Sequence, residues 1–309
     1  MPRGNTLTLT DEEIIGLFFI QRYRFLTSKQ YAMAAELNHS TAADQLRFFE
    51  RHGLLGYFGN TGLAGHGKTP KAYFLRRKGW ELLRRESDIP PELLGTYKEI
   101  KVEARWSPQM YHRLRTADVL ISAEVAVRNR PHLAMVKTFL EYRRVKRGNQ
   151  VARETTDYVD TLETAENRIV PDAAFVLENR ESGKRALFFL EMDMATERIV
   201  SYVLRDSRMT LHYKLSQYDR YLKSMRFRDT YAVYGEFRGF TLLFVTLGRE
   251  RVEHVRAEMH DLAEGFADYY RFTTFDAAMG DFLGAIWKSR LLSDTTTYPL
   301  IREESAVSG

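Results

Sequence analysis

The sequence predicts an α/β protein of the α+β class with two domains. Residues 1–88 show apolar stripes at helical spacing followed by a glycine-rich hairpin, whereas residues 109–290 alternate apolar strands with amphipathic helices. The net positive charge of the chain comes from its first part, since residues 1–115 have a balance of +6 and residues 116–309 a balance of −1. The length of 309 residues agrees with two domains of about 150 residues each.

The composition excludes several classes of protein. The chain has no cysteine, so disulfide bonds, thiolate catalysis and cysteine-ligated zinc are excluded. The apolar runs at residues 14–20 and 240–245 are shorter than the ~20 residues that cross a bilayer, and residues 1–5 lack the apolar core of a signal peptide. We therefore expect a cytoplasmic protein with no membrane partner.

Three helices and a hairpin are predicted near the N-terminus. Thr10 precedes three acidic residues and an apolar stripe, which is typical of a helix start. A second helix is predicted over residues 29–37 and a third over residues 42–52, both with capping residues in front of them. Residues 57–75 then show two apolar and aromatic segments around a glycine-rich loop, the pattern of a hairpin with a long tip.

This order of elements, together with the basic charge, predicts a winged helix-turn-helix domain over residues 1–88. Such a domain lays its third helix in the major groove of double-stranded DNA and places its wing on the backbone. Two alternatives remain open: a small helical bundle with no ligand, and a winged helix that docks another protein.

The predicted DNA contacts form two sets. Leu46 and Phe49 are expected to face the core, while Gln45 suits adenine, Arg47 suits guanine and Ala42 suits a thymine methyl group. The groove-facing set is Ser40, Thr41, Ala42, Gln45, Arg47 and Arg51. The set predicted to contact phosphates is Lys68, Lys71, Arg76 and Arg77.

A linker is predicted at residues 89–108, because three prolines interrupt the helical pattern there. The second domain is predicted over residues 109–290, and a polar, frayed tail over residues 291–309. A polar stretch at residues 146–167 is expected to be a mobile excursion. Helices are expected at residues 109–128, 200–224 and 250–270, and strands at residues 134–143, 169–178, 185–191, 229–234 and 240–247.

Three acidic residues stand at the ends of two predicted strands. Asp172 follows a proline, and Glu191 and Asp193 are two residues apart, so these two share one face of a strand. If the strands pair, Asp172 approaches them, and carboxylates this close repel one another unless a cation lies between them. Mg²⁺ or Mn²⁺ suits such oxygen ligands and activates water for attack on a phosphodiester. The structural alternative is a Pro-Asp turn, a Glu191 paired with Arg185 or Lys184, and an Asp193 that caps a helix.

This strand-turn-strand segment resembles the core of the PD-(D/E)XK nuclease superfamily. Asp172 matches the first acid of that motif and Glu191 the second, but Asp193 stands where the motif has its lysine. Some members carry the lysine on the following helix, where Lys214 is the candidate. The resemblance implies a mixed-sheet domain with a variant site for Mg²⁺ or Mn²⁺. Its catalytic residues are then Asp172, Glu191 and Lys214, and its metal ligands Asp172, Glu191 and Asp193.

Several short motifs are spread over most of the chain, about residues 10–290. They are His112-Arg113-Leu114 with Asp118-Val119, Val170-Pro171-Asp172, residues 189–193 with Thr196-Glu197, Lys214-Leu215 with Tyr218, and residues 243–246. In this combination, after a winged helix, they resemble the replication-relaxation family of plasmids and other mobile elements. The resemblance implies DNA binding in the replication or transfer of such elements, or in its control.

The enzymatic activity is left open by that family. One alternative is a metal-dependent endonuclease that nicks or cuts DNA. Another is a transcriptional regulator whose nuclease-like domain is degenerate and serves only dimerisation or the docking of a partner. A homodimer is expected by analogy with winged-helix regulators that bind palindromes.

Overall fold

The computed structural model describes residues 7–58, 70–100, 107–147, 150–195, 199, 210–259 and 264–301. The chain divides into two compact units, Met1–Ile121 and Ser122–Gly309. The division falls inside the helix α6 (Pro108–Arg128) and not in the linker expected at residues 89–108. The first turns of α6 therefore belong to unit 1 and its last turns to unit 2.

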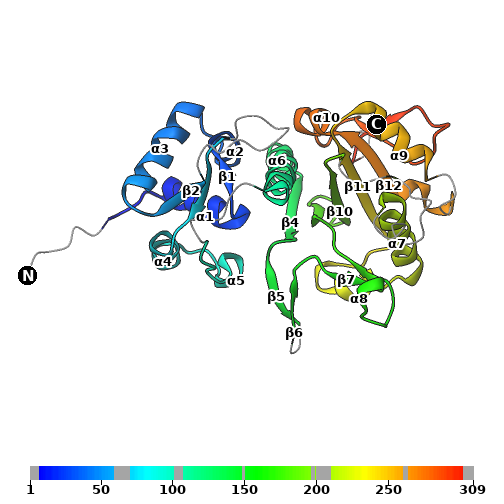
Figure 1. The fold of residues 1–309 in the computed structure, drawn as a ribbon, viewed down its shortest axis with the longest axis horizontal. Coiled ribbons are helices and arrows are strands. Elements are labelled where there is room, and N and C mark those ends of the chain that lie inside the picture. The colour runs from blue at the N-terminus through cyan, green and yellow to red at the C-terminus, as the bar shows by residue number, and fades with distance from the viewer. Residues whose placement is uncertain are drawn as a thin grey trace, which may run out of the picture. The chain divides into compact units, whose positions relative to one another are not determined.

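The described part of unit 1 combines helices with a three-stranded antiparallel sheet of order β1-β3-β2. Its elements are α1 (Asp11–Tyr23), β1 (Leu26–Thr27), α2 (Ser28–Ala34), α3 (His39–Arg51), β2 (Leu55–Phe58), β3 (Ala72–Leu75), α4 (Arg77–Glu86) and α5 (Pro91–Leu94) (Figure 1). The predicted three helices and the paired strands of the hairpin are present. The expected tip of the hairpin, residues 59–69, lies outside the described residues.

Side-chain caps begin the first two helices where the sequence predicts them. Thr10 starts α1 with a capping box, in which its hydroxyl accepts from the third backbone N–H and a glutamate accepts from its own N–H. Thr27 starts α2 in the same way, with a glutamine as the partner. Helix α3 begins earlier than predicted, because Asn38 accepts from the N–H of Thr41 at 2.9 Å. Thr41 is therefore inside the first turn of α3 and does not cap it.

Apolar faces of the three helices form the core of unit 1. Leu17 of α1, Tyr31 of α2, and Leu46 and Phe49 of α3 are all buried. A second cluster joins aromatic residues of the sheet, Phe58 and Phe74, to Met110 and Leu114 on the first turns of α6. The first turns of α6 thus cover one face of the small sheet, while the inward face of α3 is packed into the core through Leu46 and Phe49.

Among the described residues, unit 2 is built around a seven-stranded mixed sheet of order β14-β13-β12-β11-β10-β9-β4 (Figure 1). Strands β10, β11 and β12 run parallel to one another, and the other neighbours are antiparallel. The strands are β4 (Leu133–Leu140), β9 (Ala173–Asn179), β10 (Arg185–Asp193), β11 (Phe240–Thr246), β12 (Tyr270–Thr274), β13 (Trp287–Lys288) and β14 (Thr297–Tyr298).

Helices and two small hairpins complete unit 2. The helices are α7 (Leu211–Ser224), α8 (Phe227–Thr230), α9 (Arg249–Ala257) and α10 (Phe275–Gly280). The hairpins pair β5 (Arg144–Arg147) with β6 (Gln150–Arg153), and β7 (Asp157–Tyr158) with β8 (Arg168–Ile169). No helix in these described ranges combines the length and the apolar character that crossing a membrane requires.

Helix α7 packs on the sheet through aromatic side chains. Leu215, Tyr218 and Tyr221 are buried and share a hydrophobic cluster with Phe189 of β10 and Phe240 of β11. The tyrosine rings bury a large apolar area while their hydroxyl groups remain able to bond to acids at the sheet. This packing fixes the side of α7 that faces the ends of the strands.

Three sequence predictions for unit 2 are wrong. Residues 229–234 are helical, as the end of α8 and a 3₁₀ turn over Ala232–Tyr234, and are not a strand. Residues 146–167 contain paired strands where a mobile excursion was expected. Residues 291–301 are no frayed tail, because β14 adds to the sheet and Arg256, itself buried, donates to the carbonyl groups of Leu291 and Asp294.

Two predicted helices are shorter in the described residues. Helix α7 begins at Leu211 with Thr210 as its N-cap, and residues 200–209 of the expected helix lie outside the described part. The helix expected over residues 250–270 consists of α9 and a later 3₁₀ segment, Glu264–Tyr269.

Candidate functional site

Helix α3 presents a polar stripe on its outward face. Ser40, Thr41, Arg47 and Arg51 are exposed, as is Asp44. The Arg47 guanidinium lies 2.5 Å from the Asp44 carboxylate, and both side chains are 66% exposed. An ion pair this exposed contributes little to stability, so either partner is free to exchange for an outside ligand at small energetic loss.

Two members of the predicted groove-facing set, Ala42 and Gln45, are not exposed on α3. Ala42 is completely buried, so it is not available to a thymine methyl group and that prediction is wrong. The reason is spacing: Ala42, Leu46 and Phe49 lie at i, i+4 and i+7 and therefore share the inward face. Gln45 is half-buried, and its Oε1 accepts from the Tyr31 hydroxyl at 2.7 Å. In a pair with adenine this oxygen would have to accept from Tyr31 and from the adenine amino group together.

The predicted phosphate contacts are located only in part. Lys68 lies outside the described residues. Lys71 holds its ammonium 3.7 Å from the centre of the Tyr57 ring and 3.7 Å from the Glu50 carboxylate. Arg76 and Arg77 are exposed at the start of α4. Lys71 thus directly precedes β3, and the two arginines directly follow it.

The acidic residues of unit 2 meet where β9 begins and β10 ends. Leu190 pairs with Ala173 in the register, so Asp172 stands beside Glu191. The N–H of Asp172 donates to the Leu190 carbonyl at 3.1 Å, and the N–H of Met192 donates to Asp172 Oδ2 at 2.8 Å. Backbone bonds to the residues before and after Glu191 thus fix Asp172, and the Met192 N–H orients its carboxylate.

Glu191 is the most deeply buried of these acids, with 1% of its surface exposed. Its Oε1 accepts from the Tyr218 hydroxyl, and its Oε2 lies 2.5 Å from Lys214 Nζ. Lys214 and Tyr218 are four residues apart on α7 and therefore lie on the same side of that helix. The packing of α7 on the sheet thus brings the candidate lysine to the second acid.

Burial raises the pKa of Glu191 from 4.5 to about 8, because the charged form loses its hydration. The Lys214 ammonium opposes this rise, while the nearby Asp172 carboxylate adds to it. The pKa of Tyr218 is also raised, through its burial and through the Glu191 carboxylate it faces. Glu191 and Tyr218 therefore influence each other's protonation directly.

Asp193 belongs to a different set of contacts. It shares a face of β10 with Glu191, but its Oδ2 accepts from Arg251 Nε of α9 at 2.9 Å and from the Thr246 hydroxyl of β11 at 2.8 Å. Across the described ranges, no three His, Cys, Asp or Glu side chains come together as a metal-binding group. The predicted trio of metal ligands is thus wrong as a single site, because Arg251 neutralises Asp193 separately.

The described residues also fit poorly to a metal ion held by Asp172 and Glu191 alone. Both Glu191 oxygens are engaged, one by Tyr218 and the other by the Lys214 ammonium. A Mg²⁺ or Mn²⁺ ion prefers ionised oxygen ligands, whereas the raised pKa of Glu191 favours its protonated form near neutral pH. In this arrangement a cation would have to displace Lys214.

Sequence reasoning misses several partners of the acids. Arg251 is 58 residues from Asp193, and Thr246 is 53 residues away. Two further buried acids, Asp157 and Asp219, accept from the hydroxyls of Tyr221 and Tyr270. These tyrosines carried no signal beyond their apolar spacing, so only the packing of the helices on the sheet identifies them.

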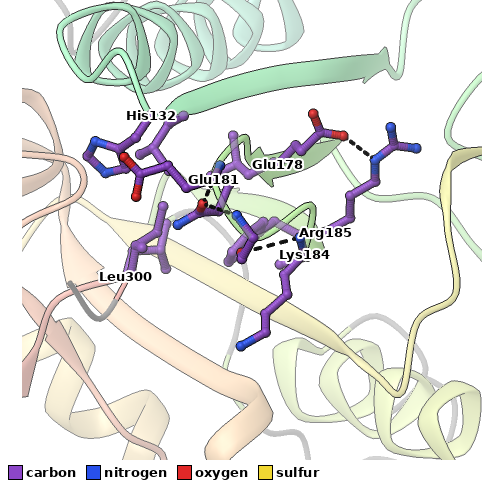
Figure 2. Close-up of a pocket in the computed structure, with 13 residues that line it drawn as sticks. His132, Glu178, Glu181, Lys184, Arg185 and Leu300 are labelled. Atoms are coloured by element: carbon purple, nitrogen blue, oxygen red, sulfur yellow. Dashed lines mark hydrogen bonds and ion pairs between the residues drawn. The ribbon is translucent and has the colours of Figure 1, made fainter. Parts of the chain in front are cut away.

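A pocket of about 590 Å³ lies at the opposite ends of β9 and β10, around the turn that joins them. Figure 2 shows Glu178 paired with Arg185 there, with His132, Lys184 and Leu300 around the opening. The structure thus separates this pocket from Asp172, which precedes β9 at its other end.

These features define an α+β protein in which one unit presents an arginine-bearing helix and the other brings an Asp-Glu-Lys cluster together where α7 packs at the strand ends of a mixed sheet. The sequence profile of the replication-relaxation family matches residues 17–236. The chain therefore belongs to the replication-relaxation family, as its motifs predicted, and this membership connects it with plasmid and mobile-element replication. Searches of curated proteins and of solved structures gave no match.

Proposed function

We propose that this chain is a DNA-binding protein of plasmid or mobile-element replication, and that unit 1 is a winged helix-turn-helix domain that contacts double-stranded DNA. The observation that carries the proposal is the division of α3 into two faces. Leu46 and Phe49 are buried, while Ser40, Arg47 and Arg51 form an exposed stripe. The order α1-β1-α2-α3-β2-β3 around a β1-β3-β2 sheet is the arrangement in which a third helix enters the major groove.

The stripe supplies both kinds of contact that recognition needs. Arg47 exchanges Asp44 for a guanine edge, and Ser40 and Thr41 at the start of α3 contact bases or phosphates. Arg51, Arg76 and Arg77 contact the phosphate backbone and orient the helix without reading sequence. Lys71 and Lys68 on the hairpin serve the same purpose.

A salt series measured by fluorescence anisotropy tests this proposal. The variant Arg47→Gln/Arg51→Gln should bind a labelled DNA duplex about 2–4 kcal/mol more weakly than the wild type does. Its affinity should also depend less steeply on the salt concentration. The control variant is Arg180→Gln/Lys184→Gln, which removes the same charge from the exposed β9–β10 turn of unit 2. Equal affinity for the α3 variant and the wild type would remove this function.

A metal-dependent endonuclease is the second candidate function. Its support is that Lys214 lies on the helix after β10, where it can replace the missing motif lysine, with Asp172 beside Glu191; a metal ion at these acids would have to displace Lys214 from Glu191. Supercoiled plasmid incubated with Mg²⁺ or Mn²⁺ is the test. Nicking that disappears in Asp172→Ala supports an enzyme, and intact plasmid under all metals supports a degenerate site in a DNA-binding regulator.

A homodimer accompanies the DNA-binding proposal. Two copies would place two α3 helices on the half-sites of a palindrome. Light scattering of the free and DNA-bound protein measures this, and one chain per duplex on a palindromic site would contradict it.

A further inference from the structure

The hairpin of β5 and β6 stands apart from the main sheet of unit 2. Its strands pair only with each other in the described structure, as a separate two-stranded sheet. Figure 1 shows it extending beyond the end of β4. An isolated two-stranded hairpin is marginally stable in water, so this one needs either anchors or a ligand.

The charge of this hairpin is strongly positive. The sequence Arg143-Arg144-Val145-Lys146-Arg147 leads into its tip, and Arg153 ends its second strand. Arg144 lies directly opposite Arg153, and Lys146 opposite Val151, so these four side chains share one face. Like charges opposite one another destabilise a strand pair unless an anion lies between them.

Packing does not account for these residues. Arg144 and Lys146 are exposed, and within the described residues neither side chain takes part in an ion pair. Val151 on the same face is 67% exposed, so no apolar core lies beneath them. Arg153 pairs with Glu141 at the base of the hairpin, which leaves the net charge of the face positive.

Buried anchors hold the base of the hairpin. Glu154, immediately after β6, is buried, and its Oε2 accepts from the N–H of Leu140 at 2.8 Å. The next residue, Thr155, donates its hydroxyl to the carbonyl of Pro171 at 2.7 Å. Before β5, the N–H of Glu141 donates to the carbonyl of Asp172 at 3.3 Å. The residues on both sides of the hairpin are thus bonded to the segment that carries Asp172.

We propose that the β5–β6 hairpin is a second double-stranded DNA-binding element, which contacts the phosphodiester backbone through Arg144 and Lys146. Because its base is bonded to Pro171 and Asp172, DNA on the hairpin passes the strand ends where Glu191 and Lys214 lie. A two-stranded ribbon fits the major groove of B-DNA, and the exposed cationic side chains of Arg144 and Lys146 gain most from a dense row of phosphates. The inference deepens the proposed function and rests on it.

The first experiment measures affinity for a labelled duplex without a specific site, at a series of salt concentrations. In Arg144→Gln/Lys146→Gln the loss of two phosphate contacts should lower the slope of log affinity against log salt by about 1.8. At about 0.1 M salt it should weaken binding by up to about 60-fold. The control is again Arg180→Gln/Lys184→Gln, at the opposite ends of β9 and β10. Circular dichroism melting verifies that both variants fold.

The second experiment uses the absence of cysteine in the chain. An iron chelate attached to Val151→Cys should cleave bound DNA at a few adjacent nucleotides. The same chelate on Val233→Cys should not, although that position is 82% exposed. Val233 lies in the turn whose Tyr234 carbonyl accepts from Arg185, at the end of the sheet far from Asp172.

The outcomes separate the two proposals. An unchanged salt slope and no cleavage from position 151, with normal weakening by Arg47→Gln/Arg51→Gln, would overturn the hairpin inference and leave the winged helix standing. A lower salt slope for Arg144→Gln/Lys146→Gln and cleavage from position 151, with unchanged binding by Arg47→Gln/Arg51→Gln, would support the hairpin and exclude α3 as the recognition helix. Absence of any DNA binding, or preferential binding of duplex RNA or anionic vesicles through Arg144 and Lys146, would overturn the inference.

Discussion

Glu191 makes the stability of unit 2 depend on pH in a direction opposite to that of an ordinary salt-bridged acid. The side chain is 1% exposed, and burial raises its pKa from 4.5 to about 8. Asp172 raises this pKa further, whereas Lys214 lowers it. The neutral form of Glu191 is therefore favoured in the folded protein at pH values where the unfolded chain is ionised.

The size of the effect follows from proton linkage. Between about pH 4.5 and pH 8 the folded state keeps a proton that the unfolded state has released, so the free energy of unfolding falls by about 1.4 kcal/mol per pH unit. The contribution is complete below pH 4.5 and is lost as the pH rises through about 8. Over the whole window this amounts to a few kcal/mol. In Glu191→Gln, which cannot ionise, this dependence should disappear.

Urea denaturation followed by circular dichroism, at several pH values between about 5 and 8, measures the effect as the difference between the wild type and Glu191→Gln. The difference cancels the titration of all other groups that the two proteins share. Lys214→Met removes the cation that lowers the Glu191 pKa, so it should move the loss of stability to higher pH. Parallel stability curves for the wild type and Glu191→Gln across this range would refute the reasoning.

Three further predictions concern stability and are checked by urea titration. Asp193→Ala removes the buried carboxylate that accepts from Arg251, so it should lower the free energy of unfolding by about 3 kcal/mol. Adding Arg251→Met should recover part of this loss, and no recovery would contradict the pairing. Gly79→Ala should lower it by ~1–3 kcal/mol, because the new Cβ would meet the Leu54 carbonyl oxygen at 2.4 Å, and an unchanged midpoint would exclude this close approach. Thr27→Ala removes the α2 capping box and should lower it by about 1 kcal/mol, whereas Thr27→Ser should retain most of the stability.

Local signals in the sequence located much of the fold. Thr10 and Thr27 begin helices because their hydroxyls bond to the backbone three residues on, a contact that needs no distant partner. The pairing of Asp172 with the end of β10 was also predictable, since one short turn joins the two strands. The prediction that Ala42 faces outward was wrong, and its spacing from Leu46 would have corrected it. Residues four apart share a helix face, so a buried Leu46 predicts a buried Ala42.

Other features were not readable from local patterns. The strand predicted over residues 229–234 is helical and does not join the sheet: Tyr231 packs into the core between α7 and β11, while Val233 is exposed. The polar C-terminal residues expected to fray instead supply β14, and the buried Arg256 bonds to their carbonyl groups. In both cases a distant element overrides the local preference.

By itself the sequence determined the α+β class, the starts of the first helices, the family and the neighbouring positions of Asp172 and Glu191. Each of these depends on residues close together in the chain or on motifs that can be matched directly. Only the tertiary structure decided that Lys214 reaches Glu191 and that Arg251 takes Asp193 out of the acidic group. A buried carboxylate must find a partner, but which cation lies near enough is set by how α7 and α9 pack on the sheet.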